Sequence, residues 1–430
     1  MRSEAWTWLP LEEVANQFQY GLSIRGEVTG RYPILRMNCQ ENGQVVLRDL
    51  QFVSLPVADA LPYLLQRGDI LFNRTNSHEL VGRAAIFNHD LEAVFASYLI
   101  RVAVNKERIE PEFLNLFLNW DFTQGELKKL ASRGVSQSNI SAGKLREFCV
   151  PVPALEIQRH IVSAVHRVNC AMTVCAKTLD AAVDLKRAAM WELFTRGLRG
   201  EAQKETEIGL VPESWDVETL GTHHSVASGG TPARNVPAYW EQGDIPWVKT
   251  TEVDYGVIID TEENITKEGL ANSAAKMLPK GTLLMAMYGQ GVTRGKVALL
   301  GMPATCNQAC AAINAKDDCV IAQYLFHFLT YRYEEIRNLA HGGQQQNLNL
   351  DIVRDLPVAA PLTLEEQREI VAILDTIDRK IGLHKRKRAV LEDLFKVLLH
   401  KLMTGEIRMA DLDLSALEPR EPAAQAAAGA

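Results

Sequence analysis

The sequence lacks any long hydrophobic run. None of its 430 residues lies in an uninterrupted apolar stretch of the roughly 18 residues that span a bilayer. Residues 1–6 lack the basic-then-apolar pattern of a secretory signal. The seven cysteines are odd in number and scattered, which is typical of reduced thiols in an intracellular protein. We therefore expect a cytoplasmic protein.

The motifs of common nucleotide-dependent enzymes are also missing. In a phosphate-binding loop, a glycine precedes the Gly-Lys pair by five residues, and Ser or Thr follows it. The nearest match, at 289–296, has Gln290 in place of that glycine and Val297 in place of the hydroxyl residue. The chain has no Asn/Asp-Pro-Pro-aromatic motif of the kind that amino-methyltransferases use. We expect no catalytic residues and no cofactor in this chain.

A metal centre is not favoured either. Cys306 and Cys310 have a spacing that zinc ligands can show, with Cys319 and His327 further along. No second close pair of ligands accompanies them, and the alternation of cysteine with alanine indicates a buried strand instead. The remaining histidines of interest have no evident acid or nucleophile partner, so we expect them to be structural: His223, His224 and His384.

Composition places the chain among ordinary globular proteins. It is 47% hydrophobic and 23% charged, and its length suggests two or three domains. The net charge of −7 argues against a nucleic-acid partner, because DNA-binding domains are usually basic. Only the binding face needs to be positive, however, so the average charge does not exclude this function.

An internal repeat is the main feature of the sequence. Its period is close to 209 residues, half the chain, which indicates a duplicated domain rather than a solenoid. The matches run in the same order through both halves. They include Trp6 with Trp215, Leu11 with Leu220, Gly21 with Gly230, 67–71 with 280–284, 82–86 with 295–299, 139–140 with 347–348, 146–148 with 354–356, and 155–159 with 364–368.

A long helix is predicted at the end of each half. Residues 155–195 contain no proline or glycine, residues 363–404 contain only Gly382, and prolines followed by acidic residues mark both starts. Apolar residues recur at heptad spacing in both stretches, which favours a coiled coil. The predicted seam comprises Ile161, Val165, Val168, Met172 and Leu179 in the first helix, and Ile370, Leu374, Ile377, Ile381, Leu391 and Phe395 in the second.

Two arrangements of these helices remain open. Each could pack on its own domain as an amphipathic helix, or the two could pair with each other, which two matched seams in one chain favour. If a pseudo-twofold axis relates the halves, the pair is antiparallel. About 40 residues at 1.5 Å each give a rod of roughly 60 Å, which would hold two globular units apart.

The remaining sequence forms two globular parts of mixed α/β (α+β) character. Buried strands are predicted near 70–72 and 283–287, and helices at 113–120 and 324–331. Polar loops lie between them, and Arg, Lys, Asn and Gln are the side chains that read base edges. Ordinary surface loops are the alternative. The candidate DNA-binding residues are Arg74, Asn76, Ser77, Thr231, Lys249, Thr250, Tyr288, Gln290, Arg294, Gln344 and Gln345.

Several short motifs in this chain are typical of one protein family. They are Gly229-Gly230-Thr231-Pro232, Tyr239-Trp240, Asp244-Ile245-Pro246-Trp247, Gly68-Asp69-Ile70-Leu71-Phe72, Leu80-Val81-Gly82-Arg83, the Glu-x-Gln-Arg entry to each long helix, and the helix ends Leu193-Phe194-Thr195 and Leu402-Met403-Thr404-Gly405. In these motifs the chain resembles the specificity subunit of a type I restriction–modification enzyme over roughly residues 1–408. The first half departs from the family's pattern, with Tyr20-Gly21-Leu22-Ser23 where the second half has a Gly-Gly-Thr-Pro loop.

This resemblance implies a non-catalytic subunit that reads a bipartite, asymmetric sequence in double-stranded DNA. Its long helices would dock two modification (methyltransferase) subunits, and two restriction (motor-nuclease) subunits would complete the assembly. S-adenosylmethionine, ATP and Mg would act in those partners. The expected organisation is a target-recognition domain at 1–154, a spacer helix at 155–200, a second recognition domain at 201–362, a second spacer helix at 363–408, and a disordered tail at 409–430.

Two alternatives from other classes remain. The first is a coiled-coil scaffold whose two domains bind protein, and the second is an unrecognised enzyme. A salt titration separates the first alternative from DNA reading, because phosphate contacts release counterions and weaken steeply as salt rises.

Overall fold

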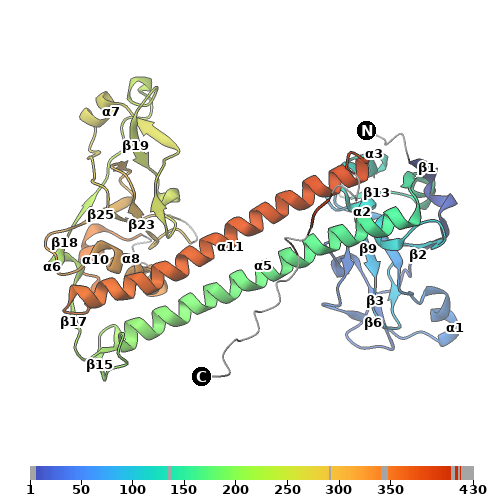
Figure 1. Ribbon diagram of the computed structural model, residues 1–430, viewed down its shortest axis with the longest axis horizontal. Helices are drawn as coiled ribbons and strands as arrows, with labels where there is room; N and C mark the ends of the chain where they lie inside the picture. The colour runs from blue at the N-terminus through green and yellow to red at the C-terminus, as the bar shows by residue number, and fades with distance from the viewer. Residues whose placement is uncertain are drawn as a thin grey trace, which may run out of the picture. The chain divides into compact units, whose positions relative to one another are not determined.

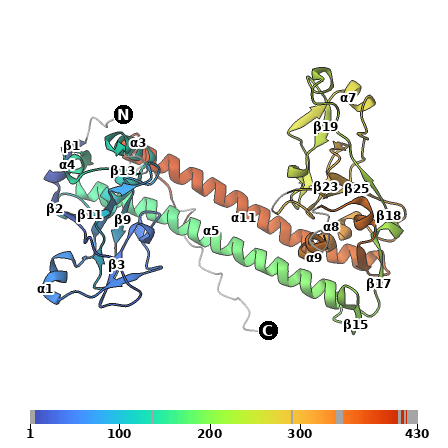
Figure 2. The same ribbon diagram turned by 180° about the vertical axis from the view of Figure 1, so that it is seen from behind.

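The computed structural model describes residues 6–133, 137–289, 292–339, 347–407, 412–414 and 417. It divides into two compact units (Figures 1 and 2). Unit 1 comprises residues 1–176 and 387–430, and unit 2 comprises residues 177–386. Both boundaries fall inside the long helices. Each unit therefore consists of one globular part and the portions of both helices that pack with it.

The globular part of unit 1 is built on a six-stranded sheet. Its central strands are buried along their length, since residues pack against both faces. The strand order is β2 (Ala15–Tyr20), β11 (Leu99–Val104), β7 (Asp69–Asn73), β9 (Ala84–Phe87), β5 (Gln44–Val45) and β4 (Gln40–Glu41).

Smaller elements complete unit 1. Helix α2 (Pro111–Asn119) begins with a proline, which suits the first turn, and packs on β9 and β7. The others are the sheet β10 (Val94–Phe95), β3 (Tyr32–Leu35), β6 (Gln51–Val53); the sheet β12 (Ser132–Arg133), β13 (Ser138–Asn139), β8 (Thr75–Asn76); the pair β1 (Thr7–Pro10), β14 (Cys149–Val152); and helices α1 (Val57–Ala60), α3 (Asp121–Leu130) and α4 (Ala142–Arg146).

Unit 2 repeats this architecture. Its main sheet follows the order β18 (His224–Ser228), β25 (Cys310–Ala315), β22 (Leu283–Ala286), β23 (Val297–Leu300), β20 (Val257–Ile258). Its other elements are the sheet β21 (Glu263–Ile265), β19 (Ile245–Val248), β24 (Thr305–Cys306); the pairs β17 (Asp216–Thr219) with β26 (Pro357–Ala360) and β15 (Gln203–Thr206) with β16 (Gly209–Pro212); and helices α6 (Leu220–His223), α7 (Lys267–Ala271), α8 (Ala322–Tyr331), α9 (Tyr333–Leu339) and α10 (Leu350–Arg354).

Matching backbone details confirm the predicted duplication. The Leu11 amide donates to the Phe148 carbonyl, and the Leu220 amide donates to that of Leu356. The turns before β7 and β22 carry glycines with nearly equal positive φ, 92° at Gly68 and 91° at Gly281. These are backbone angles that glycine adopts without a Cβ penalty.

One predicted match is off by a residue. The amide of Gly21 donates to Leu99, and that of Gly229, rather than Gly230, makes the corresponding bond to Cys310. A Cβ on Gly21 or Gly229 would lie 2.3 or 2.1 Å from a backbone carbonyl oxygen, so both positions require glycine. The shift arises at a β-bulge, where one extra residue, Asn16, lies in β2 opposite the step from Ala103 to Val104.

The two long helices are α5 (Leu155–Arg196) and α11 (Leu364–Thr404). Unit 1 contains the start of α5 and the end of α11, and unit 2 contains the reverse, so the helices run antiparallel within each unit (Figure 1). The members of the predicted seam are all buried or half-buried: Ile161, Val165, Val168, Met172, Leu179, Ile370, Leu374, Ile377, Ile381, Leu391 and Phe395.

The seam also joins the globular cores, so the two arrangements left open by the sequence coexist. In unit 1, Val165 and Leu402 belong to the same apolar cluster as Phe113 of α2. In unit 2, Phe194 and Ile370 belong to one cluster with Tyr324 of α8. Each helix therefore packs both on its partner helix and on the globular part.

A buried glutamine fixes the start of each long helix to its globular part. Gln158 accepts a hydrogen bond from the Glu110 amide (2.8 Å) and donates to the carbonyls of Arg108 (3.1 Å) and Pro153 (2.7 Å). Gln367 makes the equivalent bonds with the Ile321 amide (3.0 Å) and the carbonyls of Cys319 (2.7 Å) and Pro361 (3.1 Å). Both side chains are fully buried.

Of the stretch from 409 onward, for which a disordered tail is predicted, the structure describes residues 412–414 and 417. Leu412, Leu414 and Leu417 contact the apolar core of unit 1. Within the described residues, no helix is both long and apolar enough to cross a membrane.

Candidate nucleic-acid interface

In unit 2, the Gly229-Gly230 loop passes tightly over β24 and carries Thr231 to the surface. A Cβ on Gly230 would lie 2.3 Å from the backbone of Ala274, so only glycine allows this close approach. The Thr231 hydroxyl then donates to the side-chain oxygen of the exposed Gln308. The result is a neutral polar pair with free donor and acceptor capacity.

A second polar pair lies next to Gln308 and joins its neighbour Asn307 to Thr250. Thr250 and Asn307 exchange side-chain hydrogen bonds of 3.0 and 3.2 Å. Tyr288, whose side chain is 43% exposed, follows Met287, whose amide donates to Ala309 (2.8 Å). Three predicted residues, Thr231, Thr250 and Tyr288, therefore gather around the segment 307–309, which the sequence did not single out.

Two basic side chains of the same unit, Lys249 and Arg234, already form ion pairs with carboxylates. Lys249 forms ion pairs with Glu262 and Glu263, and Arg234 pairs with Glu263. The Arg234 guanidinium stacks 3.8 Å from the ring centre of Trp240. The Arg234 hydrogen bond holds the pKa of Glu263 below its usual value, and the hydrogen bond to Glu262 raises the pKa of Lys249. To contact phosphate, these cations would have to exchange carboxylates for it.

Arg294 does not fit its predicted role. Its side chain is only 7% exposed, and its guanidinium donates to the backbone carbonyl of Arg337 (3.5 Å). Packing beneath α9 therefore turns it away from solvent, and in this conformation it cannot reach a base. Gln290, Gln344 and Gln345 lie outside the described residues.

In unit 1, the predicted residues follow β7 into β8. Arg74 lies 4.7 Å from the ring centre of Tyr20 and donates to the Ser97 carbonyl (3.3 Å) and the Asn139 side chain (3.4 Å). It is therefore a packing residue as much as a candidate DNA contact. Asn76 is half-buried and accepts from the amide of Ser77, which is exposed. This edge carries a different set of polar groups from that of unit 2.

The cysteine and histidine predictions have mixed outcomes. Cys306 and Cys310 lie buried on β24 and β25, as their alternation with alanine indicated. A hydrogen bond between the two thiols and their burial raise the pKa of Cys310. His223, expected to have no acidic partner, contacts two carboxylates, Asp317 and Glu218. Sequence could not reveal this because Asp317 is 94 residues away along the chain.

Among the described residues, two groups of side chains have the composition of metal ligands. The first is His223, Asp317 and Cys319. The second is His327, Asp375 and Asp378, in which His327 bonds to Asp375 (2.9 Å) and Asp378 pairs with Lys186 of α5 (2.7 Å). The lysine already neutralises a carboxylate of the second group, which suits a structural ion-pair network.

Comparison with known proteins assigns the chain to a family. Residues 5–178 and 212–393 match the model of the type I restriction modification DNA specificity domain, once in each half of the chain. The chain belongs to this family. It supplies DNA-sequence specificity in a type I restriction–modification system, and catalysis in such systems resides in partner subunits.

Relatives and solved structures agree. The chain is 26% identical to the MjaX type I restriction enzyme specificity subunit of Methanocaldococcus jannaschii, over 94% of both chains. It is 26% identical to the EcoR124I/EcoR124II specificity subunit of Escherichia coli, over 56% of this chain and 57% of that one. The fold resembles that of the S subunit from M. genitalium, with a TM-score of 0.60, 15% identity, and coverage of 92% of this chain and 96% of the other.

The helices of this specificity subunit expose apolar side chains away from the seam. The seam residues pack within the chain, and a role for the long helices in partner binding stays a prediction. The exposed apolar residues are Ile157, Val174, Val390, Leu394 and Val397 on the helix portions of unit 1, and Val183, Leu185, Trp191, Ile373 and Leu383 on those of unit 2.

Proposed function

We propose that each unit reads one half of a bipartite, asymmetric DNA site. The observation that carries this proposal is one architecture built twice, with unlike side chains at corresponding sheet edges. Unit 2 presents Thr231 with Gln308. The matched backbone bonds from Gly230 to Cys306 and from Leu22 to Phe95 show that the equivalent residues of unit 1 are Ser23 and Ser97. Hydrogen-bonding side chains select bases by their donor and acceptor pattern, so different side chains on one scaffold would select different half-sites.

We further propose that two modification subunits dock on the exposed apolar side chains of α5 and α11, one for each repeat. Single surface hydrophobic residues are normal, but each unit exposes five of them on its portions of the two helices, which a partner could cover. Two restriction subunits would complete the assembly. S-adenosylmethionine, ATP and Mg would be bound by these partners, and the complex would act on DNA in the cytoplasm.

Exchange of globular parts tests the reading proposal. Residues 1–154 or 201–362 would be replaced by the equivalent segment of a relative that recognises a different sequence. Each chimera, assembled with the modification subunit, should change one half of the methylated site and leave the other intact. If one exchange alters both halves, or neither, the assignment of one half-site to each unit is wrong.

The division of labour has its own test. The purified chain should neither methylate nor cut DNA, and methylation should appear when the modification subunit is added. DNA binding should weaken steeply as salt rises, because phosphate contacts release counterions. Turnover by the chain alone, with partner contamination excluded by mass spectrometry, would contradict the proposal.

A further inference from the structure

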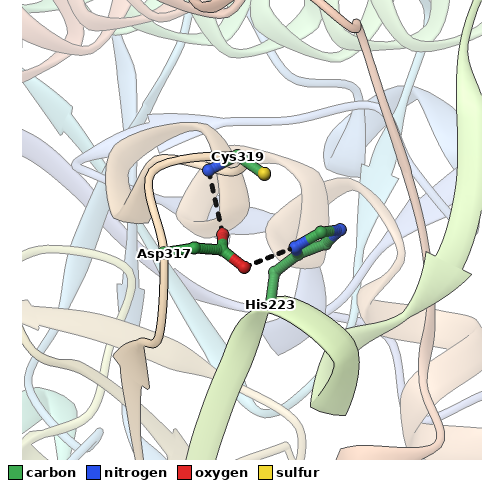
Figure 3. Close-up of side chains that lie close together, drawn as sticks. All are labelled: His223, Asp317 and Cys319. Carbon is green, nitrogen blue, oxygen red and sulfur yellow. Dashed lines mark hydrogen bonds and ion pairs between the residues drawn. The ribbon is translucent and has the colours of Figure 1, made fainter.

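Unit 2 contains a cluster of three side chains of the types that zinc prefers. His223 ends α6, and Asp317 and Cys319 lie in the loop between β25 and α8. One ligand atom from each, an imidazole nitrogen, a carboxylate oxygen and the sulfur, lies within 4.8 Å of the other two. Figure 3 shows the Asp317 carboxylate between the Cys319 amide and the His223 ring. Zinc in proteins is bound by this combination of nitrogen, oxygen and sulfur.

The surrounding hydrogen bonds orient these donors. The Nδ1 atom of His223 faces Asp317 at 2.9 Å, while its Nε2 atom faces Glu218 at 3.1 Å. A histidine that binds a metal through one nitrogen usually donates from the other to a carboxylate, which is the position of Glu218. The Cys319 amide donates to the second oxygen of Asp317 (2.9 Å) and fixes that carboxylate.

The loop that bears the thiol is also held in place. The Cys319 carbonyl accepts from the buried Gln367 (2.7 Å), and the Lys316 amide donates to the His223 carbonyl (2.8 Å). The cluster borders an open hollow of about 420 Å³ that Glu218, His223 and Cys319 help to line. A metal ion could therefore enter from solvent without rearrangement of the backbone.

The repeat provides an internal comparison, because unit 1 has the same backbone arrangement at the equivalent segments but lacks these donor side chains. The Asn105 amide donates to Val14 as that of Lys316 does to His223, and Gln158 bonds to Arg108 as Gln367 does to Cys319. The residues of unit 1 that correspond to Glu218, His223, Asp317 and Cys319 are therefore Leu9, Val14, Lys106 and Arg108. The fold itself does not require the donors.

We propose that unit 2 binds one divalent transition-metal ion of the zinc class through His223 Nδ1, Asp317 and Cys319. Zinc–ligand bonds of 2.0–2.3 Å place neighbouring ligand atoms roughly 3.3–3.8 Å apart. His223 Nδ1 and the Asp317 oxygen, now 2.9 Å apart, would therefore have to move apart by less than about 1 Å. Binding would release the thiol proton and any proton shared between Nδ1 and Asp317. A water molecule would take the fourth position, and the ion would tie α6 to the loop before α8.

Cobalt(II) serves as the probe, because a cobalt–thiolate bond gives a charge-transfer band in the near ultraviolet. The full-length chain would be stripped with a chelator and titrated with Co²⁺. We expect one equivalent to bind with this band and one equivalent of Zn²⁺ to displace it. Cys319→Ser should abolish the band, and His223→Gln should weaken binding. Glu218→Gln should weaken it about 10–100-fold, as loss of an orienting carboxylate does.

Two further variants test whether a loss of cobalt binding is specific to the proposed site and is not caused by misfolding. Cys149→Ser, a matched control at a half-exposed thiol of unit 1, should keep the band. Asp317→Lys installs the residue that unit 1 uses, so it should keep the circular dichroism spectrum of the metal-free protein and lose cobalt binding. The proposal is overturned if the wild-type chain gives no thiolate band, if the band survives in Cys319→Ser, or if Cys149→Ser removes it.

Discussion

Replacing the buried glutamine at the start of either long helix should loosen the attachment of one unit and spare the other. Gln158→Met keeps the side-chain length and removes both polar atoms. The Glu110 amide then loses its acceptor, and the carbonyls of Arg108 and Pro153 lose a donor. Gln367→Met is the matched change in unit 2, where the amide of Ile321 is affected.

The expected loss in the free energy of unfolding follows from the backbone groups that lose their hydrogen-bond partner. A buried polar group without its partner costs about 1–3 kcal/mol. The amide carries that cost in full, whereas each carbonyl has a second lone pair, so we expect a loss of about 2–5 kcal/mol for either variant. Domains of this kind are stable by only about 5–15 kcal/mol, so the loss is measurable. Arg368→Ala, a change at an exposed ion pair next to Gln367, should cost less than about 1 kcal/mol.

Hydrogen exchange followed by mass spectrometry, together with urea unfolding, measures this effect. Gln158→Met should reduce protection of the peptide that contains Glu110 and leave the peptide that contains Ile321 unchanged, and Gln367→Met should do the reverse. The reasoning fails if either variant loses less than about 1 kcal/mol, or if both peptides lose protection equally in each variant.

Four shorter predictions follow from other parts of the molecule. Asp69→Ala should destabilise unit 1 by about 3–5 kcal/mol in thermal unfolding, because Arg101 would remain buried without its 2.8 Å partner; replacing both residues with leucine should restore most of the loss. Glu263 has a lowered pKa, so its stabilising contribution is present above pH 4.5 and is lost as the pH falls through the lowered value; Glu263→Gln should flatten that limb of a stability–pH curve. Gln308→Ala should relax one position of one half-site at a cost of about 1–3 kcal/mol in binding assays, and unchanged selectivity would remove Gln308 from the reading surface. Four residues inserted into each long helix at matched positions add about 6 Å and should lengthen the preferred gap between half-sites by about two base pairs in site selection; an unchanged gap would mean that the helices do not set it.

The duplication and the long helices could be predicted from the sequence because each produces a regular spacing of residues: about 209 residues between the matched motifs, and 3.5 residues between apolar side chains of the helices. A 3.5-residue apolar repeat encodes which side of a helix is buried, whatever its partner, and α5 and α11 follow it closely. The one-residue error at Gly21 shows the limit of this approach. The bulge adds one exposed residue, Asn16, next to the exposed Gln17, and matching of similar residues at a fixed spacing does not detect such a single insertion.

The polar edge of unit 2 was predicted only in part, because its geometry depends on contacts between distant segments. Thr231 meets Gln308 across 77 residues, and Thr250 meets Asn307 across 57. Nothing local to Gln308 indicates that contact. Arg294 was misassigned for the same reason: a loop arginine appears exposed in a sequence, and only the packing of α9 over it shows otherwise.

Mapping of methylated bases in cells that express this chain with its modification subunit tests the central claim most directly. If two unlike units each read half a site, methylation will fall in one asymmetric motif made of two specific half-sites separated by a gap of fixed length and free sequence. A continuous motif, or one whose two halves are identical by symmetry, would contradict the account.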